Sequence, residues 1–86
     1  MQLTVDISMY PLHDNYKDPI RWLIKRLDSY QGIERVTNSL STQVTGDYDA
    51  VMQMLSVEMK AAYEQFGTAV FVCKFLQGEF DLRRRT

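Results

Sequence analysis

Alternating apolar and polar side chains open the chain and predict a β-strand over residues 2–10. The apolar side of this segment carries Leu3, Val5, Ile7 and Met9, and the other side carries Thr4, Asp6, Ser8 and Tyr10. A period of two is the pattern of a strand that buries one of its faces. Because Pro11 has no backbone N–H and restricts the preceding residue to extended conformations, we expect the strand to end at Tyr10.

The next apolar pattern has helical spacing and predicts a helix that starts at Asp18 and Pro19. The aspartate can cap the free amides of a first turn, and proline suits the first helical position. Gly32 is expected to end this helix as a left-handed cap. The predicted apolar positions are Ile20, Leu23, Ile24 and Leu27.

A second helical pattern starts at Asp47 or Asp49 and ends at Gly67. Its apolar stripe consists of Met52, Leu55, Met59, Ala62 and Phe66. Three further β-prone segments are predicted to be strands, over residues 33–38, 40–45 and 68–77, with a turn at Asn38 joining the first two. Gly46 is expected to end the third strand of the chain.

The resulting order, β-α-β-β-α-β, predicts an α+β fold of the ferredoxin-like type. Short connections and right-handed crossovers favour a four-stranded antiparallel sheet in the order 4-1-3-2, with both helices on one face. We expect one domain over residues 1–78, followed by a C-terminal tail over residues 79–86.

Composition narrows the functional classes. The chain has 86 residues, 24% of them charged, and a net charge of -1, so no broad positive field would attract a nucleic acid backbone. The N-terminal segment alternates instead of forming an apolar run, so we expect neither a signal peptide nor a membrane span. Cys73 is the single cysteine, which excludes an intrachain disulfide and suits a cytoplasmic protein.

The residues that usually carry catalysis are scarce. His13 and Cys73 fall on different predicted elements, and nothing places a base beside a nucleophile. No metal-ligand spacing and no glycine-rich phosphate loop is present. We therefore expect a protein that is not an enzyme and that needs no metal or cofactor.

Polar residues are expected to converge at one edge of the sheet, where strand one ends and strand three begins. Together with Tyr10, this cluster contains Thr37, Asn38, Ser41, Thr42 and Thr68. Hydroxyl, amide and aromatic groups of this kind suit a small, flat ligand, although the same residues are also ordinary β-formers and turn residues. Alternation from Leu40 places Thr42 on the helix side of the sheet and Ser41 on the open side, so both cannot line one pocket unless a bulge intervenes.

The open face of the predicted sheet carries apolar residues from the last strand. Val70, Val72 and Leu76 are expected to face away from the helices, beside Thr4, Asp6 and Ser8. An exposed apolar patch of this kind usually marks an interface. We therefore expect a homodimer or a larger homo-oligomer.

Three short segments resemble the YkoF-related family of small ferredoxin-like domains that bind thiamine or its hydroxymethylpyrimidine moiety. They are residues 7–12 (ISMYPL), 41–46 (STQVTG) and 49–52 (DAVM). The resemblance implies a non-catalytic binding protein linked to thiamine uptake or salvage. Such domains occur in tandem in that family, so here a second subunit would replace the second copy.

The resemblance also implies roles for individual residues. An amide such as that of Asn38 would read the aminopyrimidine, and a hydroxyl of Ser41 or Thr42 would bind the hydroxymethyl group. Tyr10 would stack on the ring, and Tyr10, Trp22 or Asp6 would face the thiazolium cation. The predicted ligand-binding residues are Ser8, Tyr10, Thr37, Asn38, Ser41 and Thr42.

Two other functions remain open from the sequence. The first is a structural or regulatory interaction module that oligomerises through its sheet, since this fold hosts many unrelated functions. The second is an enzyme of acylphosphatase type, which would need an arginine in the loop after strand one. Residues 11–17 contain no arginine.

Overall fold

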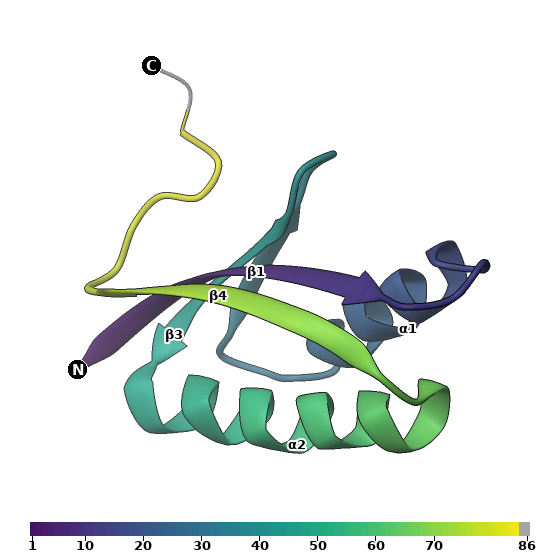
Figure 1. The fold of residues 1–86 in the computed structure, drawn as a ribbon. Helices are drawn as coiled ribbons and strands as arrows, with labels where there is room; N and C mark the ends of the chain where they lie inside the picture. The colour runs from purple at the N-terminus through teal and green to yellow at the C-terminus, as the bar shows by residue number, and fades with distance from the viewer. Residues whose placement is uncertain (85–86) are drawn as a thin grey trace.

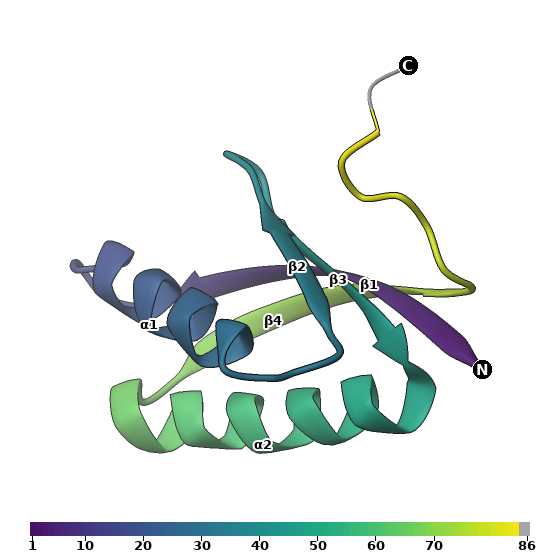
Figure 2. The same ribbon diagram turned by 180° about the vertical axis from the view of Figure 1, so that it is seen from behind.

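Four strands and two helices follow one another in the predicted order in the computed structural model, which describes residues 1–84 (Figure 1). The elements are β1 (Gln2–Pro11), α1 (Lys17–Asp28), β2 (Glu34–Thr37), β3 (Thr42–Asp47), α2 (Tyr48–Phe66) and β4 (Ala69–Gln77). The strands form one antiparallel sheet in the order β2-β3-β1-β4, which is the predicted order read from the other edge. Figures 1 and 2 show both helices on the same side of this sheet, and the ferredoxin-like fold is confirmed.

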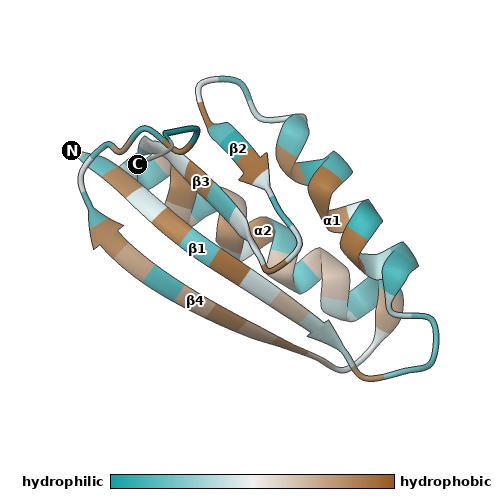
Figure 3. Cartoon of the chain, turned by 90° about the horizontal axis from the view of Figure 1, so that it is seen from above, coloured by the Kyte–Doolittle hydropathy of each residue, from teal (hydrophilic) through white to brown (hydrophobic). Residues whose placement is uncertain are grey.

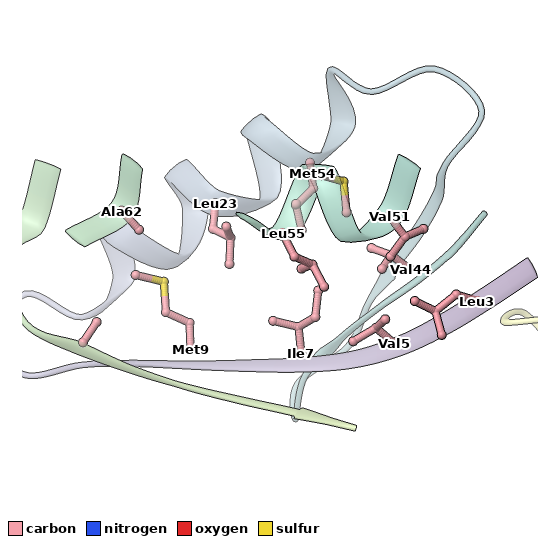
Figure 4. Packing of buried hydrophobic residues seen from close by; sticks show 12 residues of the cluster. Leu3, Val5, Ile7, Met9, Leu23, Val44, Val51, Met54, Leu55 and Ala62 are labelled. Atoms are coloured by element: carbon pink, nitrogen blue, oxygen red, sulfur yellow. The ribbon is translucent and has the colours of Figure 1, made fainter. Parts of the chain in front are cut away.

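The core lies between the helices and one face of β1. Its side chains Leu3, Val5, Ile7 and Met9 are all at most 8% exposed and point toward the helices (Figure 4). Val5 lies opposite Val44 on one side and Phe75 on the other, so the apolar rows of three strands align. The alternation in the sequence therefore reflects the burial of one face of β1, as predicted.

The buried face of α2 agrees with most of the predicted stripe and adds residues that were not predicted. Leu55 and Ala62 are in the core as expected, but Met52 is 38% exposed. The full set of buried residues on this helix is Val51, Met54, Leu55, Glu58 and Ala62. Met59 is partly buried against the same core, so the predicted stripe holds at Leu55, Met59 and Ala62 and fails at Met52. Glu58 was not expected among the buried residues, because a charged side chain interrupts the apolar pattern.

Glu58 joins the two helices from this buried position. Its side chain is 2% exposed, and its carboxylate accepts hydrogen bonds from Arg26 Nε at 2.7 Å and from the Tyr30 hydroxyl at 2.6 Å. Arg26 also lies 5.5 Å from the centre of the Trp22 ring. Burial, together with the bond to Glu58, raises the pKa of the Tyr30 phenol. Since a buried carboxylate is costly without partners, these contacts fix α1 against α2.

The ends of the first helix also differ from the prediction. Helix α1 starts at Lys17, and the side chain of Asn15 bonds to both the backbone and the carboxylate of Asp18. The aspartate therefore lies inside the first turn and is not the cap. The helix ends at Asp28, and Gly32 (φ 80°) lies in the turn that follows, so a separate turn comes between the helix and β2.

Two strand boundaries and one cap complete the comparison. Strand β1 continues through Pro11, which lies opposite Ala69, and β3 runs to Asp47 instead of ending before Gly46. A Cβ atom at Gly46 would lie 3.0 Å from the carbonyl oxygen of Gly32, so this glycine allows the turn before β2 to approach the backbone of β3 closely. Asp47 caps α2 by accepting a hydrogen bond from the amide of Ala50, which is one of the two predicted starts.

The C-terminal segment leaves the sheet on the side opposite the helices (Figure 1). Its start is fixed by the amide of Gly78, which donates to the carbonyl of Gln2, and by the Thr4 hydroxyl, which donates to the carbonyl of Gly78. Residues 79–84 form no helix or strand, and residues 85 and 86 of the predicted tail lie outside the described part of the chain. Neither described helix is long and apolar enough to cross a membrane.

The contact between Arg26 and Glu58 predicts an asymmetry between two substitutions. Arg26→Met leaves a buried carboxylate without its cation, whereas Glu58→Met leaves a half-exposed guanidinium that water can solvate. Arg26→Met should therefore lower the free energy of unfolding more than Glu58→Met, and Glu58→Met should remain within about 1.5 kcal/mol of wild type. Urea unfolding measures both. Equal losses in the two variants would contradict the role assigned to the buried carboxylate.

Candidate functional site

A pocket of about 120 Å³ lies between the end of β1, the β2–β3 hairpin and α1. All six residues predicted to bind a ligand are among those that line it. The full lining consists of Ile7, Ser8, Met9, Tyr10, Ile20, Leu23, Ile24, Thr37, Asn38, Ser39, Leu40, Ser41 and Thr42. Most ligand sites measure roughly 300–1,000 Å³, so this pocket has room for one small ring and not for a large molecule.

A chain of hydrogen bonds ends at the hydroxyl groups of the pocket. Asp28 accepts from the guanidinium of Arg35, which donates at 2.8 Å to the Thr37 hydroxyl. The Thr37 and Thr42 hydroxyls lie 2.9 Å apart, and Thr42 is 7% exposed. Because the Thr37 oxygen already accepts from Arg35, its own hydrogen can point to Thr42, which leaves the Thr42 hydrogen for an acceptor in the pocket.

Asn38 closes the hairpin. Its side-chain oxygen accepts hydrogen bonds from the backbone amides of Leu40 at 2.9 Å and Ser41 at 3.1 Å. The backbone N–H of Asn38 donates to the backbone carbonyl of Ser41. The Nδ2 group lies 3.4 Å from the side-chain oxygen of Gln43. This geometry matches the predicted turn and occupies the oxygen that a bidentate contact with a pyrimidine would need, so only the NH₂ group remains for a ligand.

Ser41 points to the other face of the sheet. Its hydroxyl donates to Asp6 Oδ1 at 2.6 Å, and Gln43 Nε2 donates to the same oxygen at 2.9 Å. The bond from Ser41, followed by the bond from Gln43, lowers the pKa of the Asp6 carboxyl. The predicted alternation therefore holds in the structure, with the side chain of Thr42 on the helix side and that of Ser41 on the open side. The expectation that the two residues cannot border one pocket is wrong, because the pocket lies at the end of the hairpin and both residues line it.

Tyr10 and Trp22, the two aromatic residues considered for the ligand site, lie in different places. Tyr10 borders the pocket with its side chain 54% exposed, in the same row of β1 as Ser8. Trp22 and Thr68 do not line the pocket. The Trp22 ring instead packs edge-on against Phe66, with 5.4 Å between the ring centres. Tyr10 is thus the aromatic residue of the predicted set that can reach a ligand at the mouth of the pocket.

The walls of the pocket are apolar. Ile7 and Met9 come from β1, and Ile20, Leu23 and Ile24 come from α1. Figure 4 shows Met9 and Leu23 facing each other across the space between the sheet and α1. A flat ring held between such walls would meet the threonine hydroxyls at one end, which combines an apolar lining with a few converging polar groups.

A larger groove, of about 690 Å³, lies at the opposite edge of the sheet under the C-terminal segment. It contains three carboxylates and Phe80, and it was missed in the sequence because the segment after residue 78 was expected to be a plain tail. One of the carboxylates, Glu34, lies 3.9 Å from Arg83. The lining residues are Gln2, Gly32, Ile33, Glu34, Thr45, Gly46, Glu79, Phe80 and Asp81.

The single cysteine of the chain, Cys73, is partly buried. Burial, with a smaller effect of Asp6, raises the pKa of the Cys73 thiol, which is the opposite of what activates a nucleophile. Within residues 1–84, no three side chains of the metal-binding types form a group that could hold an ion.

Comparison with known proteins shows similarity at the level of structure. No protein-family model matches the sequence, and no curated protein matches it. Protein SP2199 from Streptococcus pneumoniae is 20% identical, with a TM-score of 0.83 over 92% of this chain and 89% of that chain. TM0486 from Thermotoga maritima, assigned provisionally to thiamine biosynthesis or salvage, is 17% identical, with a TM-score of 0.78 over 87% of this chain and 82% of that chain.

A domain of unknown function from Bacillus cereus (DUF77) is also similar, with 14% identity and a TM-score of 0.73 over 91% of this chain and 77% of that chain. All three share the fold. At these identities the similarity establishes the common ferredoxin-like architecture, with a thiamine-related protein and a DUF77 domain among the structural neighbours of the chain.

The hydrogen bonds to Asp6 predict how stability depends on pH. Because the pKa of Asp6 is lower in the folded chain than in the unfolded one, where it is about 3.9, the unfolded state binds more protons as the pH falls. The contribution of this carboxylate is present above about pH 4 and is lost in more acidic solution. Asp6→Asn should therefore flatten the fall in unfolding free energy below about pH 4.

Urea unfolding at a series of pH values between 2 and 6 measures this effect. Ser41→Ala serves as a partial control, because it removes the hydrogen bond that contributes most to the shift. It should flatten the curve less than Asp6→Asn does. A wild-type slope in Asp6→Asn would show that the carboxylate is not stabilised as described.

Proposed function

We propose that this protein is a non-catalytic binding protein for thiamine or its hydroxymethylpyrimidine moiety, linked to thiamine uptake or salvage. The observation that carries the proposal is the pocket beside the paired hydroxyls of Thr37 and Thr42, because the residues predicted to bind a ligand border it, although the Ser41 hydroxyl itself points to the other face. The resemblance of residues 7–12, 41–46 and 49–52 to the YkoF-related family supports it, as does the fold shared with TM0486.

The chemistry of the pocket suits an aminopyrimidine. Ile7 and Met9 on one side and Leu23 on the other provide apolar surfaces for the two faces of a flat ring. The hydroxyl pair of Thr37 and Thr42 offers both a donor and an acceptor, which match a ring nitrogen, an exocyclic amine or a hydroxymethyl group. The volume of about 120 Å³ fits this ring alone, so the rest of thiamine would lie outside.

Tyr10 is the residue placed to meet that outer part. Its ring is 54% exposed at the mouth of the pocket. The thiazolium of thiamine is cationic, and an aromatic face attracts a cation by about 0.5–1 kcal/mol at an exposed site. Ser8 lies in the same row of β1 and borders the pocket beside it. We assign Tyr10 to the thiazolium and Thr42 to the pyrimidine.

A second subunit is part of the proposal. Val70, Val72 and Leu76 on the open face of β4 are 45%, 50% and 54% exposed, and the pocket is small for a complete ligand site. Packing of two chains through their sheets would cover these side chains and replace the tandem domain of the YkoF-related family. We place the resulting homo-oligomer in the cytoplasm, without a nucleic acid or membrane partner.

An interaction module without a ligand is the second candidate, favoured by the same exposed apolar face and by the small volume of the pocket. The two candidates differ in their response to pyrimidines. A ligand at about 100 times its dissociation constant adds about 2.7 kcal/mol to stability, which corresponds to a shift of about 10 °C or more for a domain of this size.

Thermal unfolding with thiamine, hydroxymethylpyrimidine and a panel of amino acids tests this difference. We expect a shift of the unfolding midpoint with the pyrimidine ligands and none with the amino acids. A midpoint that does not move with either pyrimidine at millimolar concentration would leave the interaction module as the better account.

Thr42 and Ser41 form a matched pair for locating the site. Thr42→Val keeps the shape of the side chain and removes the pocket hydroxyl, so it should weaken pyrimidine binding by about tenfold, the equivalent of one hydrogen bond. Ser41→Ala removes a hydroxyl that points to Asp6 on the other face and should leave the affinity within about twofold. Calorimetric titration measures both, and an equal effect of the two changes would move the ligand away from this pocket.

A further inference from the structure

One carboxylate and one ammonium lie among the apolar side chains of the open face. Lys74 on β4 is directly opposite Asp6 on β1. The same face of β4 carries Val72 and Leu76 on either side of the lysine, and both are at least half exposed. Figure 3 looks onto this face and shows β4 as a largely hydrophobic strand interrupted by one hydrophilic band.

The Asp6 carboxylate is held in place by hydrogen bonds to one of its two oxygen atoms. Its Oδ1 atom accepts two hydrogen bonds, from Ser41 and from Gln43. Among residues 1–84, no side chain donates to Oδ2, and no carboxylate lies within ion-pair distance of the Lys74 ammonium. The face therefore presents one fixed negative group and one positive group, each with capacity for a further partner.

The shape of the molecule limits where a partner can pack. Thr4 and Thr45 are 8% and 7% exposed, because their hydroxyls bond to each other and the C-terminal segment passes over that end of the sheet. The β2–β3 hairpin rises along one side (Figures 1 and 2). The accessible part of the face is the area over β1 and β4, in which Asp6 and Lys74 lie side by side.

We propose that a second copy of this chain packs face to face over β1 and β4, with each Lys74 paired to Asp6 of the other copy. This inference rests on the homodimer included in the proposed function and gives that dimer its register. A two-fold axis parallel to the strands, between β1 and β4, places the lysine of one chain over the aspartate of the other in both halves.

The physical reason is the cost of an unpaired charge. Covering Val72 and Leu76 with a second sheet also removes water from Asp6 and Lys74, and a desolvated charge without a partner is strongly unfavourable. The two groups are self-complementary, so two copies of one surface satisfy both charges at once. A two-fold axis across the strands would instead place Asp6 against Asp6 and Lys74 against Lys74. A shift along the strands would place Asp6 against Val72 or Leu76 and separate it from the lysine, so the pair fixes the register.

Charge reversal with mixing tests the proposal. In Lys74→Glu the new carboxylate would face Asp6 of the other copy, and in Asp6→Lys two ammonium groups would meet. Each variant alone should self-associate at least about tenfold more weakly than wild type. An equimolar mixture should associate again, because both contacts of the mixed dimer then join opposite charges. Analytical ultracentrifugation measures the association, and circular dichroism checks that each variant is folded.

The mixture separates contacts between chains from effects within one chain. Repulsion between positions 6 and 74 of the same chain would weaken both variants, and mixing would not restore association. Lys60→Glu, a reversal at an exposed position of α2, is the control and should leave association unchanged. If Asp6→Lys does not fold, Lys74→Met and Lys74→Arg replace it, and only the methionine variant should lose association.

Three results would overturn the proposal: a monomeric wild-type chain, a dimer that persists in both charge variants, and a mixture that stays monomeric. A persistent dimer would indicate another surface, such as the free edge of β4. Thermal shifts with hydroxymethylpyrimidine on the same samples keep the two claims apart. A ligand shift without the predicted association pattern refutes only the register, whereas a correct pattern without a ligand shift refutes only the pyrimidine site.

Discussion

The alternation of side chains along β1 is the constraint on which the rest of the structure depends. This strand lies in the middle of the sheet, paired with β3 and β4, and every residue on it belongs either to the core or to the open face. A shift of one residue in its register would move Val5 into solvent and Asp6 into the core. The core and the open face are therefore opposite sides of one alternating pattern, and the neighbouring residues Thr42 and Ser41 of the hairpin point to these two sides.

The buried contact of Glu58 with Arg26 and Tyr30 is the second determinant of the site. It fixes α1 against α2, and α1 supplies one wall of the pocket through Leu23. An ion pair of this kind contributes modestly to stability, but it specifies which faces of two helices meet. The pocket thus depends on a group that lies outside it.

The fold was predictable because each element carries a clear local signal. The alternation of apolar and polar residues identified the buried face of β1, and the order of the elements allowed few sheet topologies. The burial of Glu58 on α2 was not predictable from hydrophobicity, because this carboxylate is buried only with Arg26 and Tyr30 as its partners. The role of Gly46 was hidden for a similar reason, since its neighbour Gly32 comes from a different part of the chain.

The candidate site could be outlined from topology but not resolved in detail. The sequence placed the end of β1 beside the hairpin, and the structure brings those residues around one pocket. It could not show that the oxygen of Asn38 is occupied by the turn, or that Arg35 orients the Thr37 hydroxyl, because both depend on side-chain geometry. The groove under Phe80 was equally hidden, since it depends on the path of the C-terminal segment.

The most direct test of the account is a map of amide chemical shifts in the ¹⁵N-labelled protein as hydroxymethylpyrimidine is added. Binding in the proposed pocket predicts the largest changes at Thr37 and Thr42 and along the Leu23 side of α1. Changes centred on Gly32 and Phe80 would place the ligand in the groove at the opposite edge. Such a result, or a spectrum that does not change at millimolar ligand, would contradict the claim that this pocket binds the pyrimidine.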